Sequence, residues 1–324
     1  MRSVLVTGAT GFIGQQLVKC LLAEHVSVRA LVRDPAKASH LPSAVELFQG
    51  DLTKAESLHG VCQGIDTVFH VAGLAHAWAE KSALAADQHR AINLQGTEAL
   101  LEAARHVHAF VYFSTVKAVA DSATMIDESF QALPDCAYGL AKRAAEALVL
   151  QSPIAHVCVL RPTLVYGPGC KGNLALMLKL IDRGYFLPVP EVNNKRSMIG
   201  LVDMCRAALL AATLPPANRQ TYIVSDGHTY TTRQLYDTLR HALKLKPRTW
   251  AIPYGLLAVA ATCGDVFGWC LRRRFVFDSQ ALHKLTSSAH YQSHAIYSDL
   301  GFKAEQNFRQ AAVEMVEYYR QHSL

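Results

Sequence analysis

The chain has 324 residues, of which 51% are hydrophobic and 18% are charged, so a large buried core is expected and extensive disorder is excluded. The length fits an α/β enzyme with a smaller second domain. The formal charge of +6 is modest, and no nucleic-acid motif accompanies the longest basic run, residues 272–274; a mild cation excess suits an anionic substrate such as a nucleotide phosphate.

The eight cysteines are scattered and show neither a CxxC pair nor a metal-ligand spacing. Most lie in apolar runs, as buried free thiols do. This pattern predicts a reduced, cytoplasmic protein without a metal site. A strand begins at the first residues of the sequence, which leaves no room for a signal peptide before it.

The first half of the chain alternates strand and helix patterns. Short β-branched or apolar runs predict strands at 3–7, 27–32, 45–48, 67–71, 110–113 and 156–160. Apolar spacing predicts helices at 12–24, at 88–106 and before residue 150. This order predicts right-handed βαβ units, and hence a Rossmann-type, doubly wound parallel sheet in a dinucleotide-binding domain over residues 1–165.

Beyond residue 165 the alternation degrades, and Pro and Gly cluster at 167–169 and 187–190. One further strand is predicted at 221–224, and the remaining segments have helical patterns. We therefore expect residues 166–324 to form a smaller, mostly helical substrate-binding lobe that is interleaved with the sheet.

Residues 251–271 are nearly all apolar and are followed by Arg272, Arg273 and Arg274. The length approaches that of a membrane span, but Pro253, Gly264 and Asp265 interrupt the run. The pattern favours a buried pair of helices, and the alternatives are a peripheral membrane contact through 251–274 and a true span.

A glycine-rich loop, TGATGFIG at residues 7–14, joins the first strand to the first helix. Gly8, Gly11 and Gly14 would let the backbone approach a pyrophosphate, and the helix N-terminus would supply N–H groups. The third strand ends at Gly50-Asp51-Leu52. The Asp51 carboxylate either accepts a hydrogen bond from an adenine amino group or caps the following turn.

The end of the second strand predicts the choice of cofactor. An NAD site places a carboxylate there for the ribose 2′-hydroxyl, whereas a nearby arginine favours the 2′-phosphate of NADP. Here Val32 occupies the expected position and Arg33 follows it, while Asp34 comes late and precedes Pro35. The sequence therefore favours NADP(H), with NAD(H) as the alternative.

Tyr138 and Lys142 lie four residues apart in a predicted helix, where such positions share a face. A lysine ammonium near the tyrosine hydroxyl would favour the phenolate and lower the tyrosine pKa from its usual ~10. Such a tyrosine can exchange a proton with an alcohol or ketone while a nicotinamide carries the hydride. The alternative is two solvated residues on a surface helix, which the glycine loop disfavours.

These motifs resemble the extended short-chain dehydrogenase/reductases, the NAD-dependent epimerase/dehydratase family acting on nucleotide sugars. TGATGFIG (7–14), GDL (50–52), VFHVAG (68–73), YFST (112–115), YGLAK (138–142) and RPTLVYGPG (161–169) follow the family order. The resemblance implies a catalytic triad of Thr115, Tyr138 and Lys142. It also implies cofactor contacts from the glycine loop, from strand ends and from the triad: Gly8, Gly11, Phe12, Ile13, Gly14, Arg33, Asp51, Leu52, Ala72, Asn93, Tyr138 and Lys142.

The resemblance also implies substrate contacts in the second lobe. Arg196 matches a phosphate-contacting arginine, and Asn173 lies in the substrate-facing loop; Thr115 would contact the reacting oxygen. The alternatives are a surface salt bridge for Arg196 and a loop N-cap for Asn173. His70 and His76 lie near the expected cofactor, but packing or solvation is the simpler expectation for both.

Two differences from the family pattern reduce the number of reactions that the chain is expected to catalyse. The 4,6-dehydratases place an Asp-Glu pair directly after the catalytic threonine, whereas Val116 and Lys117 follow Thr115 here. Asp127 and Glu128 lie too far along the chain, where a surface-loop role is expected. The 4-epimerases hold NAD tightly and usually carry the acid that the second strand lacks.

The segments NNKRSMIGLVD (193–203) and YIVSDG (222–227), with the apolar segment, look like bacterial UDP-4-keto-6-deoxy-hexosamine 4-reductases of surface-glycan (O-antigen) synthesis. The resemblance implies hydride transfer from NADPH to the C4 ketone of a UDP-4-keto-6-deoxy-N-acetylhexosamine, with Tyr138 as proton donor, in a homodimer. A 4-epimerase acting on UDP-glucose or UDP-N-acetylglucosamine is the alternative; a steroid or flavonoid reductase and a non-catalytic NADP-binding regulator are disfavoured.

Overall fold

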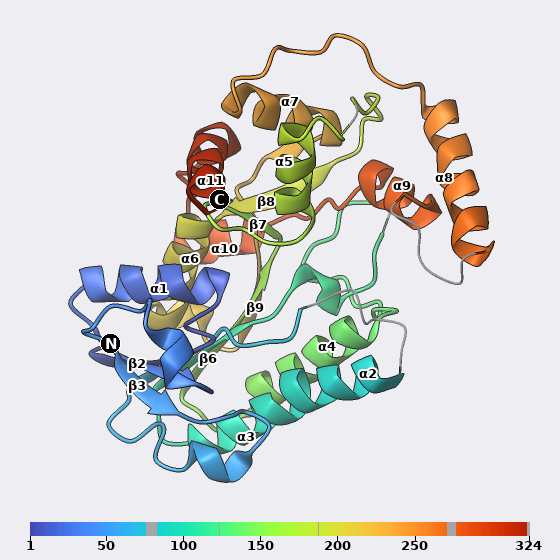
Figure 1. The fold of residues 1–324 in the computed structure, drawn as a ribbon. Helices are drawn as coiled ribbons and strands as arrows, with labels where there is room; N and C mark the ends of the chain where they lie inside the picture. Colours follow the sequence, from blue (N-terminus) through green and yellow to red (C-terminus); the bar gives the residue numbers. More distant parts are fainter. Residues whose placement is uncertain (76–82, 123, 187, 271–276, 323–324) are drawn as a thin grey trace.

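A computed structural model describes residues 1–75, 83–122, 124–186, 188–270 and 277–322. Its centre is a seven-stranded parallel sheet with the order β3-β2-β1-β4-β5-β6-β9 (Figure 1). The strands are β1 (Ser3–Thr7), β2 (Ser27–Val32), β3 (Glu46–Gln49), β4 (Thr67–His70), β5 (Ala109–Phe113), β6 (His156–Pro162) and β9 (Gln220–Val224). The predicted fold class, an α/β Rossmann-type parallel sheet, is confirmed.

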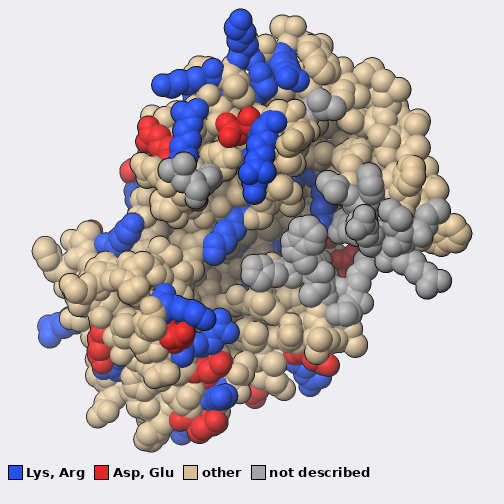
Figure 2. Space-filling view, in the orientation of Figure 1, with Lys and Arg blue, Asp and Glu red and all other residues tan. Residues whose placement is uncertain are grey.

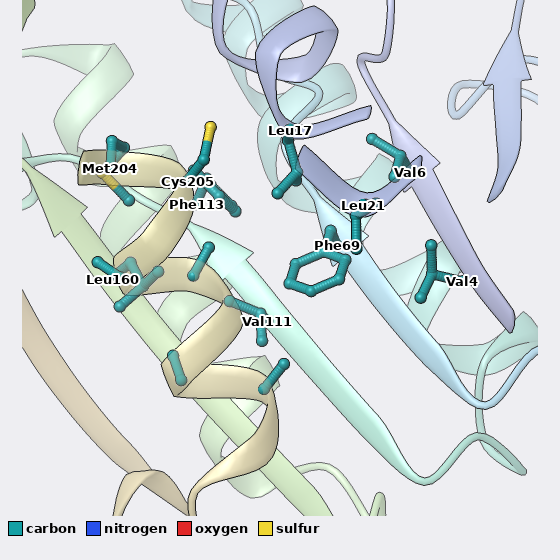
Figure 3. Packing of buried hydrophobic residues seen from close by; sticks show 14 of the residues in the cluster. Val4, Val6, Leu17, Leu21, Phe69, Val111, Phe113, Leu160, Met204 and Cys205 are labelled. Atoms are coloured by element: carbon teal, nitrogen blue, oxygen red, sulfur yellow. The ribbon is translucent and has the colours of Figure 1, made fainter. Parts of the chain in front are cut away.

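Helices cover both faces of this sheet. On one face lie α1 (Phe12–Ala23) and α6 (Leu201–Thr213), and on the other lie α3 (Gly96–Ala103) and α4 (Ala137–Gln151). Successive strand residues point to opposite faces, so Val4 and Val6 of β1 pack with Leu17 and Leu21 of α1, as Figure 3 shows. Leu5 packs on the other side. Because both faces are buried, the strands read as continuous apolar runs.

The second lobe contains a small sheet that the sequence patterns did not predict. Its strands are β7 (Leu164–Tyr166), β8 (Arg196–Gly200) and β10 (Thr229–Tyr230), in the order β10-β8-β7. Around it lie α5 (Asn173–Asp182), α7 (Thr232–Ala242) and α11 (Phe308–His322), which share one apolar cluster. α10 (His294–Leu300) packs against β9. Short 3₁₀ turns occur at η1 (Pro35–Ala38), η2 (Ala55–Leu58), η5 (Val116–Ala118) and η6 (Pro215–Ala217).

The long helix expected at 88–106 is interrupted. α2 (Ala83–His89) leads into a π-helical segment, η4 (Arg90–Gln95), which continues as α3. π-Helical turns are rare and occur often at functional sites. Here the wider turn carries Asn93, one of the expected cofactor contacts.

The buried pair of helices expected at 251–271 is wrong. The segment forms one helix, α8 (Tyr254–Cys270), and most of its large side chains are exposed. It lies beside α9 (Ser279–Thr286), at the edge of the second lobe (Figure 1). Among the residues that the structure describes, no helix has both the length and the apolar character needed to cross a membrane.

Candidate active site

The glycine loop crosses the carboxyl end of β1 in a conformation that side chains would block. Gly8 has φ +70°, and a Cβ there would lie 2.7 Å from the backbone nitrogen of Ala72. A Cβ on Gly14 would overlap the carbonyl oxygen of Gly8. α1 begins beside these glycines, and its N-cap residue, Gly11, makes no side-chain capping bond. Phe12 and Ile13 are the first residues of this helix, so the loop fits the pyrophosphate of a dinucleotide.

An exposed arginine, Arg33, lies at the end of β2. Val32 ends the strand and Arg33 is exposed. The Asp34 carboxylate turns into the following loop, where it caps η1 by accepting a hydrogen bond from the nitrogen of Ala36 (3.1 Å). The Arg33 charge acts on Asp51 across the same sheet edge. This edge therefore carries the arginine expected for a 2′-phosphate.

Asp51 stabilises the turn directly after it, whereas the N-cap of the next helical turn, η2, is Lys54. Its Oδ1 accepts hydrogen bonds from the backbone nitrogen and the hydroxyl of Thr53, both 2.9 Å long. The Thr53 hydrogen bonds and the nearby Arg33 hold the pKa of Asp51 below its usual range. An adenine contact through Oδ2 remains a prediction. Leu52, also an expected contact, packs at the buried edge of the sheet core.

A buried histidine, His70, forms hydrogen bonds at the end of β1 and to α3, below the glycine loop. His70 bonds Thr7 through Nδ1 (2.7 Å) and Thr97 through Nε2 (3.0 Å). The Thr97 hydroxyl donates to the carbonyl of Asn93, and the Thr7 hydroxyl accepts from the nitrogen of Ala72. These directions assign the proton of His70 to Nε2. Burial, with the nearby charge of Lys142, lowers the pKa of His70 to about 3, so the ring is neutral. Of the two histidines expected to be structural, His70 is buried in this network, and His76 lies outside the described residues.

Asn93 secures the loop that follows β4. Its Oδ1 accepts from the nitrogen of Leu74 (2.8 Å), and its Nδ2 donates to the carbonyl of the same residue (3.0 Å). Nδ2 also lies 3.3 Å from Nδ1 of His89, whose ring centre is 5.5 Å from that of Tyr138. Asn93 thus links the cofactor loop to the neighbourhood of the tyrosine.

The structure separates the two hydroxyl residues that follow β5. Ser114 is buried and donates to Oε1 of Glu146 (2.6 Å), so it points into the protein. Thr115 is half-buried and caps η5, accepting from the nitrogen of Lys117 (3.1 Å). This arrangement leaves Thr115 as the hydroxyl at the surface of the site.

Tyr138 is the second residue of α4 and is half-buried. The next residue, Gly139, allows the start of α4 to approach η5, because a Cβ there would overlap the carbonyl oxygen of Lys117. Contacts between α4 and η5 follow from this close approach. The glycine therefore holds the segment of Tyr138 beside the segment of Thr115.

Lys142 lies one helical turn beyond Tyr138 and is almost fully buried. Its Nζ donates to the carbonyl of Phe113 (2.7 Å) and lies 4.5 Å from the ring centre of Tyr112. Burial lowers the pKa of Lys142 to about 7, and the negative charge of Glu146 opposes that shift. A lysine with such a pKa is poised between its charged and neutral forms near neutral pH.

Glu146 occupies the next position on the same face of α4, and its carboxylate is buried. Its two oxygens accept from Nε (2.8 Å) and Nη2 (2.6 Å) of Arg161 on β6. The side chains of this pair are 3% and 2% exposed. Neither residue was predicted as part of the site; the signal in the sequence was a glutamate four residues after Lys142.

The other two expected substrate residues, Asn173 and Arg196, lie in α5 and β8. Asn173 is the exposed first residue of α5, and the N-cap of that helix is Gly172, so the expected N-cap alternative does not apply to Asn173. Arg196 donates to the hydroxyl of Thr232 and to the carbonyls of Lys284 and Ser287 at the end of α9. Burial lowers the pKa of Arg196 from its ordinary value. A diphosphate contact by either residue remains a prediction.

Asp127 and Glu128 differ in their surroundings. Asp127 accepts from Ser129 within its loop, as expected. Glu128, in contrast, is half-buried and accepts from the backbone nitrogen of Ile223 in β9 (2.9 Å). The surface-loop expectation is therefore wrong for Glu128, whose carboxylate secures the edge strand of the sheet.

Comparison with known proteins accounts for this arrangement. Residues 4–225 match the model of the NAD dependent epimerase/dehydratase family. The chain belongs to this family. This is a family of Rossmann-fold enzymes, and the glycine loop and the parallel sheet of this chain agree with that fold.

Several epimerase/dehydratase relatives resemble the chain over most of its length. A UDP-glucose 4-epimerase of Vibrio cholerae is 29% identical over 99% of this chain and 96% of its own. A ketoreductase of 4-hydroxy-2-methyl-3-oxo-4-farnesyl-3,4-dihydroquinoline-1-oxide from Stigmatella aurantiaca is 31% identical over 80% of this chain and 79% of its own. The structure of MoeE5 in complex with UDP-glucose and NAD superimposes with a TM-score of 0.75 at 24% identity, covering 99% of this chain and 100% of MoeE5.

Proposed function

We propose that the protein is an NADP(H)-dependent reductase of a nucleotide sugar, and that it reduces the C4 ketone of a UDP-4-keto-6-deoxy-N-acetylhexosamine. The observation that carries this proposal is the cation at the end of β2. An epimerase returns the hydride to the same sugar and retains its cofactor, whereas a reductase must exchange its cofactor after every turnover. Arg33, with Asp34 turned away into a cap, suits an exchangeable NADP(H).

The triad supplies the proton side of the reaction. When bound, the nicotinamide supplies the hydride. Tyr138 donates its phenolic proton to the oxygen that becomes the hydroxyl, while the Thr115 hydroxyl orients that oxygen. Lys142 would hold the nicotinamide ribose, and its charge would stabilise the phenolate that Tyr138 leaves behind. The glycine loop and the N-terminus of α1 bind the pyrophosphate.

The relatives support both ketone reduction and nucleotide-sugar chemistry. The Stigmatella aurantiaca relative is a ketoreductase. The Vibrio cholerae relative, a UDP-glucose 4-epimerase, supports a UDP-sugar substrate and favours the second candidate, a 4-epimerase acting on UDP-glucose or UDP-N-acetylglucosamine with tightly bound NAD. The two reactions share the triad and differ in whether the cofactor leaves.

Purified protein distinguishes the candidates directly. We expect the protein to oxidise NADPH when a UDP-4-keto-6-deoxy-N-acetylhexosamine is added, and to leave UDP-glucose and UDP-N-acetylglucosamine unchanged. Absorbance at the NADPH band and chromatography of the sugars give the two readouts. Bound NAD in the purified protein, together with interconversion of UDP-hexoses without added cofactor, would instead establish the epimerase.

Replacing Arg33 with Ala is expected to weaken NADPH binding by about 10–100-fold, because a charge-assisted hydrogen bond to the 2′-phosphate is lost. NADH lacks this phosphate, so its dissociation constant should stay near that of the wild type. Fluorescence titration with both cofactors measures the two constants. Lys37→Ala, which removes an 84% exposed cation from the same loop, is the matched control. Equal weakening of both cofactors by Arg33→Ala would contradict a 2′-phosphate contact.

A further inference from the structure

Helix α8 packs on the protein with mostly small residues and turns most of its large ones outward. Its buried or half-buried positions fall on one stripe, Leu257, Ala258, Ala261, Gly264 and Gly268. The exposed large side chains on its remaining surface are Tyr254, Leu256, Val259, Val266, Phe267 and Trp269. A helix that packs only to stabilise a fold shows the reverse pattern, with large apolar residues toward the core.

Trp250 and Trp269 lie at the two ends of this surface. Trp250 is 52% exposed just before the helix, and Trp269 is 82% exposed in its last turn. We call Trp250 and the six exposed large residues of the helix the α8 face. Tryptophan is enriched where apolar and aqueous phases meet, because its ring is apolar and its N–H is polar.

In the sequence, the positive charge of the chain is concentrated in the segment that contains this helix. Residues 238–277 contain seven Lys or Arg and one acid, Asp265, which equals the whole formal excess of +6, so the rest of the chain is formally neutral. The Asp265 carboxylate accepts hydrogen bonds from the backbone nitrogen and the hydroxyl of Ser279 at the start of α9. Lys244 and Lys246 are exposed, and the Arg248 guanidinium lies 5.5 Å from the ring centre of Trp250. In Figure 2 the visible surface over α8 carries no Lys or Arg, and Lys and Arg side chains gather over α7, from which a loop leads to α8 in Figure 1.

We propose that the α8 face binds the surface of an anionic lipid bilayer. The large apolar side chains enter the boundary between headgroups and acyl chains, and the flanking cations attract the lipid phosphates. The 17-residue helix lies along the surface, held to the enzyme by its stripe of small residues. This inference goes beyond the proposed reaction and holds for either sugar substrate.

Vesicle flotation of the full-length protein tests this proposal. Wild-type protein is expected to float with vesicles of phosphatidylglycerol and phosphatidylcholine, and less with phosphatidylcholine alone. The triple variant Leu256→Ser, Val259→Ser, Trp269→Ser should reduce the bound fraction on the anionic vesicles at least about tenfold. Lys244→Glu with Lys246→Glu should weaken binding and reduce its salt dependence. The emission of Trp250 and Trp269 should shift to shorter wavelength on binding.

The matched control replaces exposed apolar residues elsewhere. Leu47→Ser with Val313→Ser should float as the wild type does, because these side chains lie on β3 and α11. Melting temperature and NADPH binding establish that every variant is folded. Unchanged flotation of the α8 variant would overturn the proposal. So would a protein that ignores both vesicle types and instead self-associates through α8 in sedimentation analysis, since that result would assign the face to a second copy.

Discussion

Replacement of Tyr138 with Phe is expected to lower kcat about a thousandfold and to leave the dissociation constant of NADPH nearly unchanged. The variant removes one hydroxyl from a half-buried residue in the first turn of α4. Without that hydroxyl, water has to protonate the developing alkoxide. Cofactor affinity is expected to rest on the glycine loop, Arg33 and Lys142, which the substitution leaves in place. Stopped-flow NADPH oxidation and fluorescence titration measure the two quantities.

A structural effect of the Tyr138 substitution is separable from a chemical one. Tyr254→Phe makes the same change on the exposed α8 and should leave kcat unaltered. A deuterated nicotinamide adds a second readout, because slower proton transfer changes the isotope effect on kcat, whereas partial unfolding only lowers the amount of active enzyme. Near-normal kcat for Tyr138→Phe would remove this tyrosine from the reaction.

The Rossmann half of the fold was predictable because its signals are local. Each central strand is a short run of residues such as Val4–Val6, buried on both faces, and each is followed by a helix or a turn. Parallel order then follows from the alternation of elements. The small sheet was missed because β7 and β10 have only three and two residues. Such strands carry no periodic pattern, and their pairing depends on contacts distant in sequence.

α8 shows a different limit of sequence reasoning. A helix that is apolar on all sides gives no direction of burial, so hydropathy alone favoured a buried location. The side of α8 that packs on the protein is the one with small residues such as Ala261 and Gly264. The sequence does not identify this side, because the contact between α8 and α9 depends on the tertiary structure.

Sequence motifs predicted the candidate catalytic residues. They did not predict the residues that contact these through tertiary packing. Thr115, Tyr138 and Lys142 follow from recognisable spacing, although their roles remain predictions. The contact of Lys142 with the Phe113 carbonyl is set by tertiary packing, as is the pairing of Glu146 with Arg161. No spacing in the sequence indicates which strand lies under α4.

Tyr138, Lys142 and Glu146 form one stripe on α4, each four residues from the next. The stripe runs from the half-buried tyrosine, through a buried lysine, to a buried carboxylate that neutralises Arg161. Glu146 also accepts from Ser114, which precedes Thr115. We therefore infer that Glu146 is a positioning residue: it fixes the strand end that carries Thr115, and its charge keeps Lys142 protonated to higher pH.

The Glu146→Gln variant is expected to lose about 3–5 kcal/mol of unfolding free energy, because the Arg161 guanidinium stays buried without its counter-charge. Denaturant unfolding measures this loss. The double variant Glu146→Gln, Arg161→Met removes both charges and should recover most of the stability, since the uncompensated cation is gone. A loss below about 1 kcal/mol in the single variant would contradict a buried, paired carboxylate.

The pH dependence of the Glu146→Gln variant tests its effect on Lys142. The pKa of Lys142 is lowered to about 7 in the folded protein from an ordinary value of 10.5. Between these values the unfolded chain binds the proton and the folded one does not, so Lys142 makes stability rise with pH above about 7. Glu146 raises that pKa, and its loss should start the rise at a lower pH. Unfolding free energies across pH 6–9, compared with a Lys142→Met background in which this rise is absent, isolate the shift. If the unfolding free energy starts to rise at the same pH with and without Glu146, the carboxylate does not affect the pKa of Lys142. Its role would then be limited to pairing with Arg161.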